Sequence, residues 1–253
     1  VDAPFRVEDQ QKWKDRCNGL ITGGEKLLVM LDTHIDRTLG IKGMEANVLG
    51  QQKAVEIITN RPTTARGQDV DAGANWEPYE LPGSIRWALP NMTYEDEVLL
   101  YWDEAPVIVT NQPGAHVAGS WLRYDPAKVI FIGDSVVVNQ PPFLGWSDLD
   151  TWLQELEWLL SDTFRGYKIV SGRNGLVRRD SIRKLSRFLT QTSAIVADLV
   201  NQGCYLEDIL DVVPTLMKKF SVDAEQVETY QSRLVWGLEQ YIREHFPEAI
   251  KKS

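Results

Sequence analysis

The feature that most constrains this chain is a close succession of short apolar runs in its middle. These runs lie at residues 84–88, 98–102, 107–110, 120–124 and 128–132, with turn signals such as Asp125-Pro126 between them. Strand-like runs at this spacing predict an antiparallel meander. Helical patterns at residues 7–17, 51–59 and 147–160, and from 180 onward, flank the meander. The sequence therefore predicts an α/β protein in which helices and sheets pack together.

Further short runs complete this prediction. Residues 26–31, 46–49 and 167–170 are expected to form strands, and the segment at 61–84, rich in Pro, Gly and polar residues, is expected to be a long loop. Helix 147–160 has Asp148 and Asp150 near its N-terminus, where negative charge is favourable. The C-terminal helical stretch is expected to break near Gly203, Pro214 and Ser221.

Composition excludes several classes of function. The chain has 253 residues, 43% of them apolar, and nine tryptophans, enough for a sizeable core. A net charge of −9 argues against a nucleic-acid-binding protein. Cys17 and Cys204 lie far apart and indicate neither a disulfide framework nor a thiolate metal site. No apolar run approaches the roughly 18 residues of a membrane span, so no membrane association and a cytoplasmic location are expected.

Four short strings follow predicted strands, at strand-to-loop transitions. They are D-T-H-I-D-R at 32–37, G-A-H-V-A-G-S at 114–120, F-I-G-D at 131–134 and G-R-N-G at 172–175. In order and spacing they resemble the metal-binding strings of the metallo-β-lactamase-fold superfamily, which are H-x-H-x-D-H, G-H-x-x-G-S, F-x-G-D and G-H-G. The resemblance implies a four-layer αββα sandwich at residues 1–202 and a C-terminal helical extension at 203–253.

The resemblance also assigns roles to individual residues. The retained metal-ligand candidates are His34, Asp36, His116 and Asp134. Histidines of the family are replaced by Asp32, Arg37 and Arg173. The first metal position would then have Asp32, His34 and His116, a set able to bind zinc, iron or manganese. The second would be lost, because a guanidinium cannot offer a lone pair to a metal.

Three functions remain open from the sequence. The first is a metal-free relative that serves as a binding or assembly module, with Arg37 and Arg173 paired to buried carboxylates where metals would sit. The second is a mononuclear hydrolase of an ester, thioester or phosphoester, with Asp36 or Asp134 as general base. The third is an anion-binding protein in which Arg37 and Arg173 hold a carboxylate or phosphate without turnover. All three predict one pocket bounded by residues 32–37, His116, Asp134 and Arg173.

The start of the chain carries one further expectation. Val1-Asp2-Ala3-Pro4 resembles the end of a strand that, in the family, follows earlier strands of the first sheet. Without those strands a sheet edge would be open. A second copy, another protein chain or a preceding segment is therefore expected to cover it.

Overall fold

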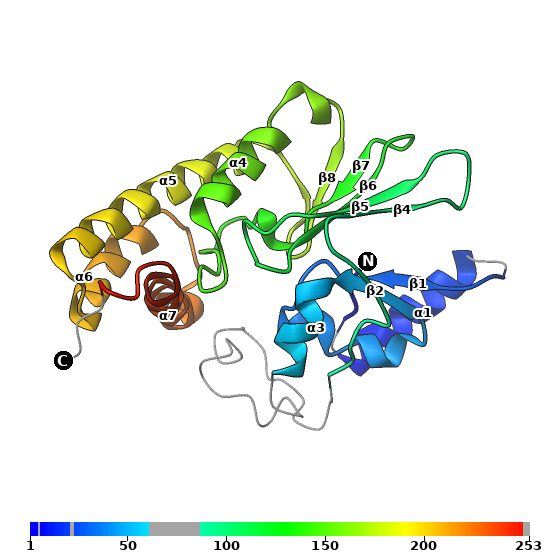
Figure 1. Cartoon of the computed structure of the whole chain (residues 1–253), viewed down its shortest axis with the longest axis horizontal. Coiled ribbons are helices and arrows are strands. Elements are labelled where there is room, and N and C mark those ends of the chain that lie inside the picture. The colour runs from blue at the N-terminus through cyan, green and yellow to red at the C-terminus, as the bar shows by residue number, and fades with distance from the viewer. Residues whose placement is uncertain (5, 21–22, 61–86, 250–253) are drawn as a thin grey trace. The chain divides into compact units, whose positions relative to one another are not determined.

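The structure is a computed structural model that describes residues 1–4, 6–20, 23–60 and 87–249. The chain divides into two compact units (Figure 1). Unit 1 comprises Val1–Asn111 and Ala118–Gly133, and unit 2 comprises Gln112–Val117 and Asp134–Ser253. Each unit is described by itself. The predicted boundary between residues 202 and 203 stays a prediction.

Unit 1 begins with helices alternating with a small parallel sheet. Its elements are α1 (Val7–Leu20), β1 (Leu27–Val29), α2 (Ile35–Thr38), the 3₁₀ helix η1 (Ile41–Met44), β2 (Asn47–Gln51), α3 (Gln52–Thr59) and β3 (Met92–Tyr94). The strand order is β1-β2-β3, with Leu28 opposite Val48 and Leu49 opposite Met92. Strand β3 was not predicted. Of the run predicted at 84–88, residues 87–88 are not in a strand, and residues 84–86 lie outside the described residues, as does the whole loop predicted at 61–84.

The meander predicted from the sequence is confirmed. Strands β4 (Glu97–Leu100), β5 (Val107–Asn111), β6 (Ser120–Tyr124) and β7 (Val129–Phe131) pair antiparallel in chain order. Val109 of β5 lies opposite Leu122 of β6. These two residues are buried against the parallel sheet of the same unit.

Strand β1 is buried on both faces because its apolar run contributes to two clusters. Leu28 and Met30 pack with Ile41, Val48 and Ile58 in one cluster. Val29 and Leu31 join the other, with Leu49, Tyr94, Val109 and Leu122. Successive residues of a strand point to opposite faces, so a continuous apolar run is what such a strand requires. This packing fixes the loop that follows β1.

Unit 2 is mainly helical. It contains α4 (Leu149–Leu159), the 3₁₀ helices η6 (Asp162–Phe164) and η7 (Ala224–Gln226), the hairpin strands β8 (Lys168–Ser171) and β9 (Gly175–Val177), α5 (Arg179–Gln202), α6 (Leu206–Met217) and α7 (Val227–His245). The 3₁₀ helix η5 (Gly133–Ser135) carries Asp134. Strand β9 was not predicted. It exists because Gly175, with φ +63°, lets the chain turn back onto β8.

The break expected at Pro214 is wrong. Pro214 lies inside α6, which continues to Met217. Proline normally disfavours a helix interior because it lacks a backbone donor. Here Leu216 and Met217, just beyond the proline, are buried, and their burial holds the last turn in helical form.

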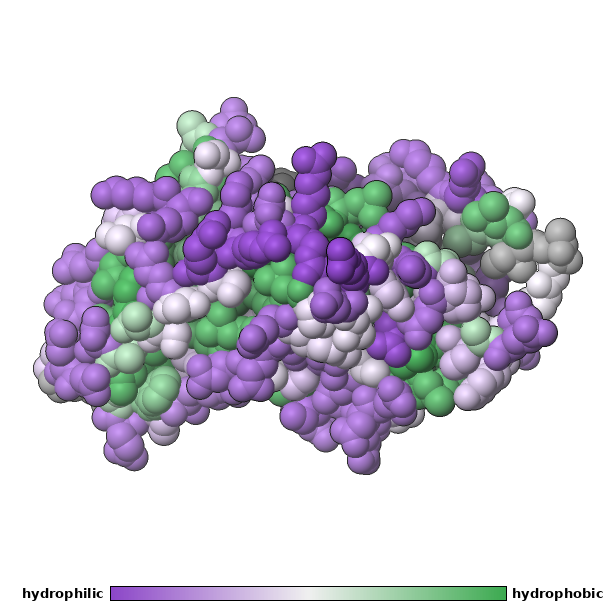
Figure 2. All heavy atoms as spheres, turned by 90° about the horizontal axis from the view of Figure 1, so that it is seen from above, coloured by the Kyte–Doolittle hydropathy of each residue, from purple (hydrophilic) through white to green (hydrophobic). Residues whose placement is uncertain are grey.

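The described part of the chain contains no helix long and apolar enough to cross a bilayer. Hydrophilic side chains cover most of the face drawn in Figure 2, and apolar residues show there as separate small patches.

Candidate functional site

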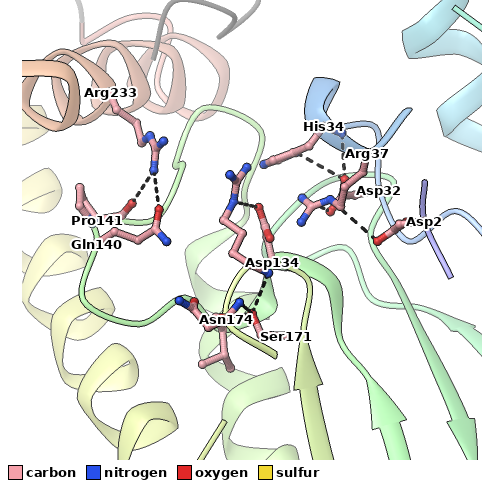
Figure 3. A network of polar contacts seen from close by, with 12 residues as sticks. Asp2, Asp32, His34, Arg37, Asp134, Gln140, Pro141, Ser171, Asn174 and Arg233 are labelled. Atoms are coloured by element: carbon pink, nitrogen blue, oxygen red, sulfur yellow. Dashed lines mark hydrogen bonds and ion pairs between the residues drawn. The ribbon is translucent and has the colours of Figure 1, made fainter. Parts of the chain in front are cut away.

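The string after β1 forms a buried charged cluster in unit 1, the Asp32 cluster, consisting of Asp2, Asp32, His34 and Arg37 (Figure 3). Arg37 Nη2 donates to Asp32 Oδ2 at 2.9 Å. The other oxygen of Asp32, Oδ1, accepts the backbone N–H of His34 at 2.8 Å. Asp32 is only 3% exposed. Both of its oxygens are therefore engaged by groups of its own unit.

Asp2 extends this cluster from the N-terminal segment. Its Oδ1 accepts the Leu31 backbone N–H at 2.9 Å, and its Oδ2 lies 3.9 Å from Arg37 Nε. Burial raises the pKa of Asp2 to about 7, while Arg37 acts in the opposite direction and lowers it. The Ala3 backbone N–H also donates to Arg37 O. One guanidinium thus faces two buried carboxyl groups.

Local structure explains why Arg37 reaches Asp32. His34 is the N-cap of the one-turn helix α2, and the N–H groups of Arg37 and Thr38 both donate to His34 O. This turn carries Arg37 back over the loop. Gly133, next to the Asp32 carboxylate, has φ +52°, a left-handed conformation that glycine adopts without strain. Asp36, the neighbour of Arg37 on α2, is half-buried.

Unit 2 contains a second charged cluster, the Asp134 cluster, consisting of Asp134, Ser171, Arg173 and Asn174. Arg173 Nε donates to Asp134 Oδ2 at 2.7 Å, and both side chains are about nine-tenths buried. Ser171 Oγ donates to Val136 O, and the Val138 N–H donates to Asn174 Oδ1. Figure 3 shows Asp134, Ser171 and Asn174 in this cluster. The β8–β9 hairpin is thereby tied to residues 134–138.

His116 lies on a separate buried loop of unit 2, residues 112–117. The Val117 N–H donates to Trp146 O, Gly114 O accepts the Asp148 N–H, and the His116 ring meets Trp146 edge-on at 5.3 Å between centroids. Glu155 Oε1 of α4 accepts the Gly114 N–H at 2.9 Å. Burial raises the pKa of Glu155 to about 7, despite the lowering effect of that hydrogen bond.

Helix α7 supports the segment that contacts this loop. Arg233, 3% exposed, donates from Nη1 to Gln140 Oε1 and Pro141 O (Figure 3). Trp236 stacks on Phe143, and a Cβ on Gly145 would lie 2.4 Å from the Trp236 ring. His245 Nε2 lies 3.0 Å from Ser147 O. The C-terminal helix therefore fixes the conformation of residues 140–147.

Sequence reasoning missed Asp2, Glu155 and Arg233 as members of these networks. A signal was present for two of them. Glu155 follows Trp152 by three positions, on the apolar side of α4, and Arg233 follows Tyr230 in the same way on α7. A charged residue at such a position is buried and needs a partner. Nothing local in the sequence identifies which partner.

The predicted site residues are thus distributed over both units. Asp32, His34 and Arg37 come together in unit 1, and Asp134 and Arg173 come together in unit 2. Arg37 or Arg173 was expected to contact Asp36 or Asp134, and the pair between Arg173 and Asp134 is one of these contacts. Arg37 pairs with Asp32, which the resemblance assigns to the other metal position. A common pocket for all of these residues, and their catalytic, substrate-binding and metal-binding roles, stay predictions.

The donor set does not fit a dinuclear centre. Arg37 and Arg173 occupy two histidine positions and offer only hydrogen-bond donors. Each also holds a carboxylate, Asp32 or Asp134, that a metal would need. At each carboxylate, a metal cation would have to compete with the guanidinium that is already at hydrogen-bond distance. In the described structure, each of the two arginines is paired with a carboxylate of its own unit.

Comparison with known proteins identifies the fold. No family model matches the sequence. No curated protein matches it either. Among solved structures, the chain is similar to a metallo-β-lactamase from Pontibacter korlensis, with a TM-score of 0.55 and 11% identity over 75% of this chain and 80% of that one. It is similar to the DIM-1 metallo-β-lactamase, with a TM-score of 0.53 and 16% identity over 76% of this chain and 81% of that one.

A longer protein covers more of the chain. A double mutant of the sec-alkyl sulfatase PisA1 matches 97% of this chain with a TM-score of 0.65 and 12% identity. The match covers 45% of the sulfatase chain, so this chain spans less than half its length. These similarities show that the chain has the metallo-β-lactamase fold, in a divergent form, with α6 and α7 as its C-terminal helices. The fold class predicted from the sequence is confirmed.

Proposed function

We propose that this metallo-β-lactamase-fold protein is a non-catalytic binding or assembly module. In it, arginine–carboxylate pairs would stand at the positions where the metallo-β-lactamase-fold superfamily has metal ligands. The observation that carries the proposal is the engagement of both Asp32 oxygens, by Arg37 and by the His34 N–H. The Arg173–Asp134 pair supports it independently in unit 2. Buried pairs of this kind satisfy carboxylates without any cofactor.

The same pairs argue against anion binding by Arg37 and Arg173. An incoming carboxylate or phosphate would have to displace Asp32 or Asp134 from a hydrogen bond of 2.9 or 2.7 Å. Removing a partner from a buried pair leaves an uncompensated charge, which is costly. Metal-free binding through another surface is the proposal that this geometry favours.

Metal analysis tests this proposal. The purified protein is incubated with zinc, manganese or ferrous iron, dialysed and analysed for bound metal and for metal-dependent thermal stabilisation. We expect less than about 0.1 equivalents of each metal and no shift in melting temperature. His116→Ala is the matched control, because it removes one predicted ligand and neither arginine pair.

One bound equivalent that is lost in His116→Ala would overturn the proposal. The mononuclear hydrolase would then replace it, with Asp32, His34 and His116 as ligands and Asp36 or Asp134 as general base. Two tightly bound equivalents would contradict both functions.

We also propose that a second chain covers the edge of the small sheet. Among the described residues β1 is the first strand in the order of its sheet, with only the Asp2 N–H donating to Val29 O beyond it, and a cavity of about 360 Å³ lies beside it in unit 1. Trp13, Leu27, Leu28 and Met44 give this cavity apolar walls. Edge strands next to apolar surface are sites of strand addition by another chain.

A further inference from the structure

A cavity of about 540 Å³ lies within unit 2. Its lining includes Val138, which is hydrogen-bonded to Asn174, but none of Asp134, Arg173 and His116. Helix α5, residues 137–139 and the segment that follows α6 form its walls. Its size is in the range of small-molecule binding sites. None of the sequence motifs that suggested the fold accounts for it.

The cavity is positively charged in a strongly acidic protein. Lys184 and Arg187 of α5 and Lys219 after α6 line it, and no acidic residue is among the described residues around it. Within the described ranges, these three side chains form no ion pair. Arg183, also on α5, differs because it pairs with Asp180. Three cationic side chains therefore line one cavity, although the chain as a whole carries −9.

Part of the cavity wall is apolar and is called its floor here; it consists of Leu185, Phe188 and Phe220. Leu185 and Phe188 are buried, and the Phe188 and Phe220 rings pack edge-on with centroids 4.8 Å apart. Ser181 and Gln191 add hydrogen-bonding groups along the α5 wall. Apolar walls with a few convergent polar groups are typical of sites that bind organic ligands.

We propose that this cavity binds a small organic anion with an apolar body and a carboxylate, sulfate or phosphate head. The apolar floor would take the body, and Lys184, Arg187 and Lys219 would take the head. An inorganic anion would leave the aromatic floor unused, and a neutral apolar ligand would leave three cations without a role. This inference goes beyond the proposed function and does not depend on it, because no residue of the arginine–carboxylate pairs lines the cavity.

Calorimetric titration with decanoate tests the proposal, since decanoate combines a carboxylate with an aliphatic body. We expect one site per chain, with binding that weakens as salt is added. Decyltrimethylammonium has a similar chain with the opposite charge and should not bind. Acetate has the head group alone and should bind far more weakly than decanoate.

Matched variants locate the site. Arg187→Gln and Lys219→Gln should each raise the dissociation constant of decanoate about threefold to tenfold, as expected for the loss of one partly exposed charge contact. Arg183→Gln and Lys218→Gln remove the same charges from neighbouring exposed positions that do not line the cavity. They should leave the constant within about twofold of the parent value.

Three results would overturn the proposal. These are no measurable decanoate binding by the folded parent, equal weakening by the lining and the neighbouring variants, and equally tight binding of decyltrimethylammonium. All four variants are at exposed positions, so circular dichroism should show them folded like the parent.

Discussion

At the residue scale, the buried pair between Arg37 and Asp32 gives the sharpest prediction. Arg37→Met keeps an apolar stem but leaves Asp32 and Asp2 without their cation, so we expect the free energy of unfolding to fall by about 3–5 kcal/mol. Adding Asp32→Asn should recover part of this loss. Urea denaturation measures both effects. Arg123→Met is the control, since its pair with the half-exposed Asp125 should contribute at most about 1 kcal/mol. Equal losses in Arg37→Met and Arg123→Met would contradict the prediction.

Glu155 gives a prediction of pH dependence. Its pKa in the folded protein, about 7, lies above its ordinary value of 4.5, so the folded state binds the proton more tightly than the unfolded state does. The stability that this provides is complete below pH 4.5 and is lost as the pH rises to 7, by about 3 kcal/mol.

Denaturation curves between pH 4 and 8 test this effect of Glu155. In Glu155→Gln the free energy of unfolding should fall by about 3 kcal/mol less over this pH range than in the parent. The amide oxygen of the glutamine can still accept the Gly114 N–H. Asp2, whose pKa burial also raises to about 7, contributes equally to parent and variant. The exposed Glu157→Gln on the same helix should retain the parent profile. A parent-like decline in Glu155→Gln would show that Glu155 is not the titrating group.

At the element scale, the N-terminus of α4 positions both Trp152 and Glu155 against the segments around His116. Asp148 caps this helix, with Oδ1 accepting the Thr151 N–H at 2.7 Å. Asp148→Ala should destabilise the protein by about 1 kcal/mol, whereas Asp148→Asn keeps an accepting oxygen and should cost only a few tenths. Thermal and urea unfolding would measure both. If alanine and asparagine had the same effect, the cap would not contribute to stability.

At the scale of the whole molecule, the proposal that a second chain covers the edge of the small sheet predicts association. Dilution followed by sedimentation velocity should show self-association of this chain or, with its partner present, a complex. Leu27→Lys places a charge on the edge strand and should weaken the association. Leu176→Lys makes the same change on the exposed strand β9 and should not. A sharply melting monomer with no associated chain would show that nothing needs to cover this edge.

Local patterns in the sequence were sufficient for the regular elements. Strand β6 was predicted at 120–124 and is found there, and the apolar spacing of Leu149, Trp152 and Leu156 predicted α4. Strands β3 and β9 were missed because each has three residues and neither lies in a continuous apolar run, unlike the equally short β1. The order of the four polar strings predicted the fold, because each string follows a strand that the fold requires.

The sequence by itself thus determined most of the elements, the fold and the replacement of three histidine ligands. Only the tertiary structure decided that Arg37 pairs with Asp32, that Asp2 joins them, and that Glu155 holds the loop before His116. The same is true of the cationic cavity between α5 and the segment after α6. The physical reason is the distance along the chain over which each kind of interaction acts. Periodicity records which face of an element is buried, whereas the partners of buried charges are chosen by contacts between residues that are far apart along the chain.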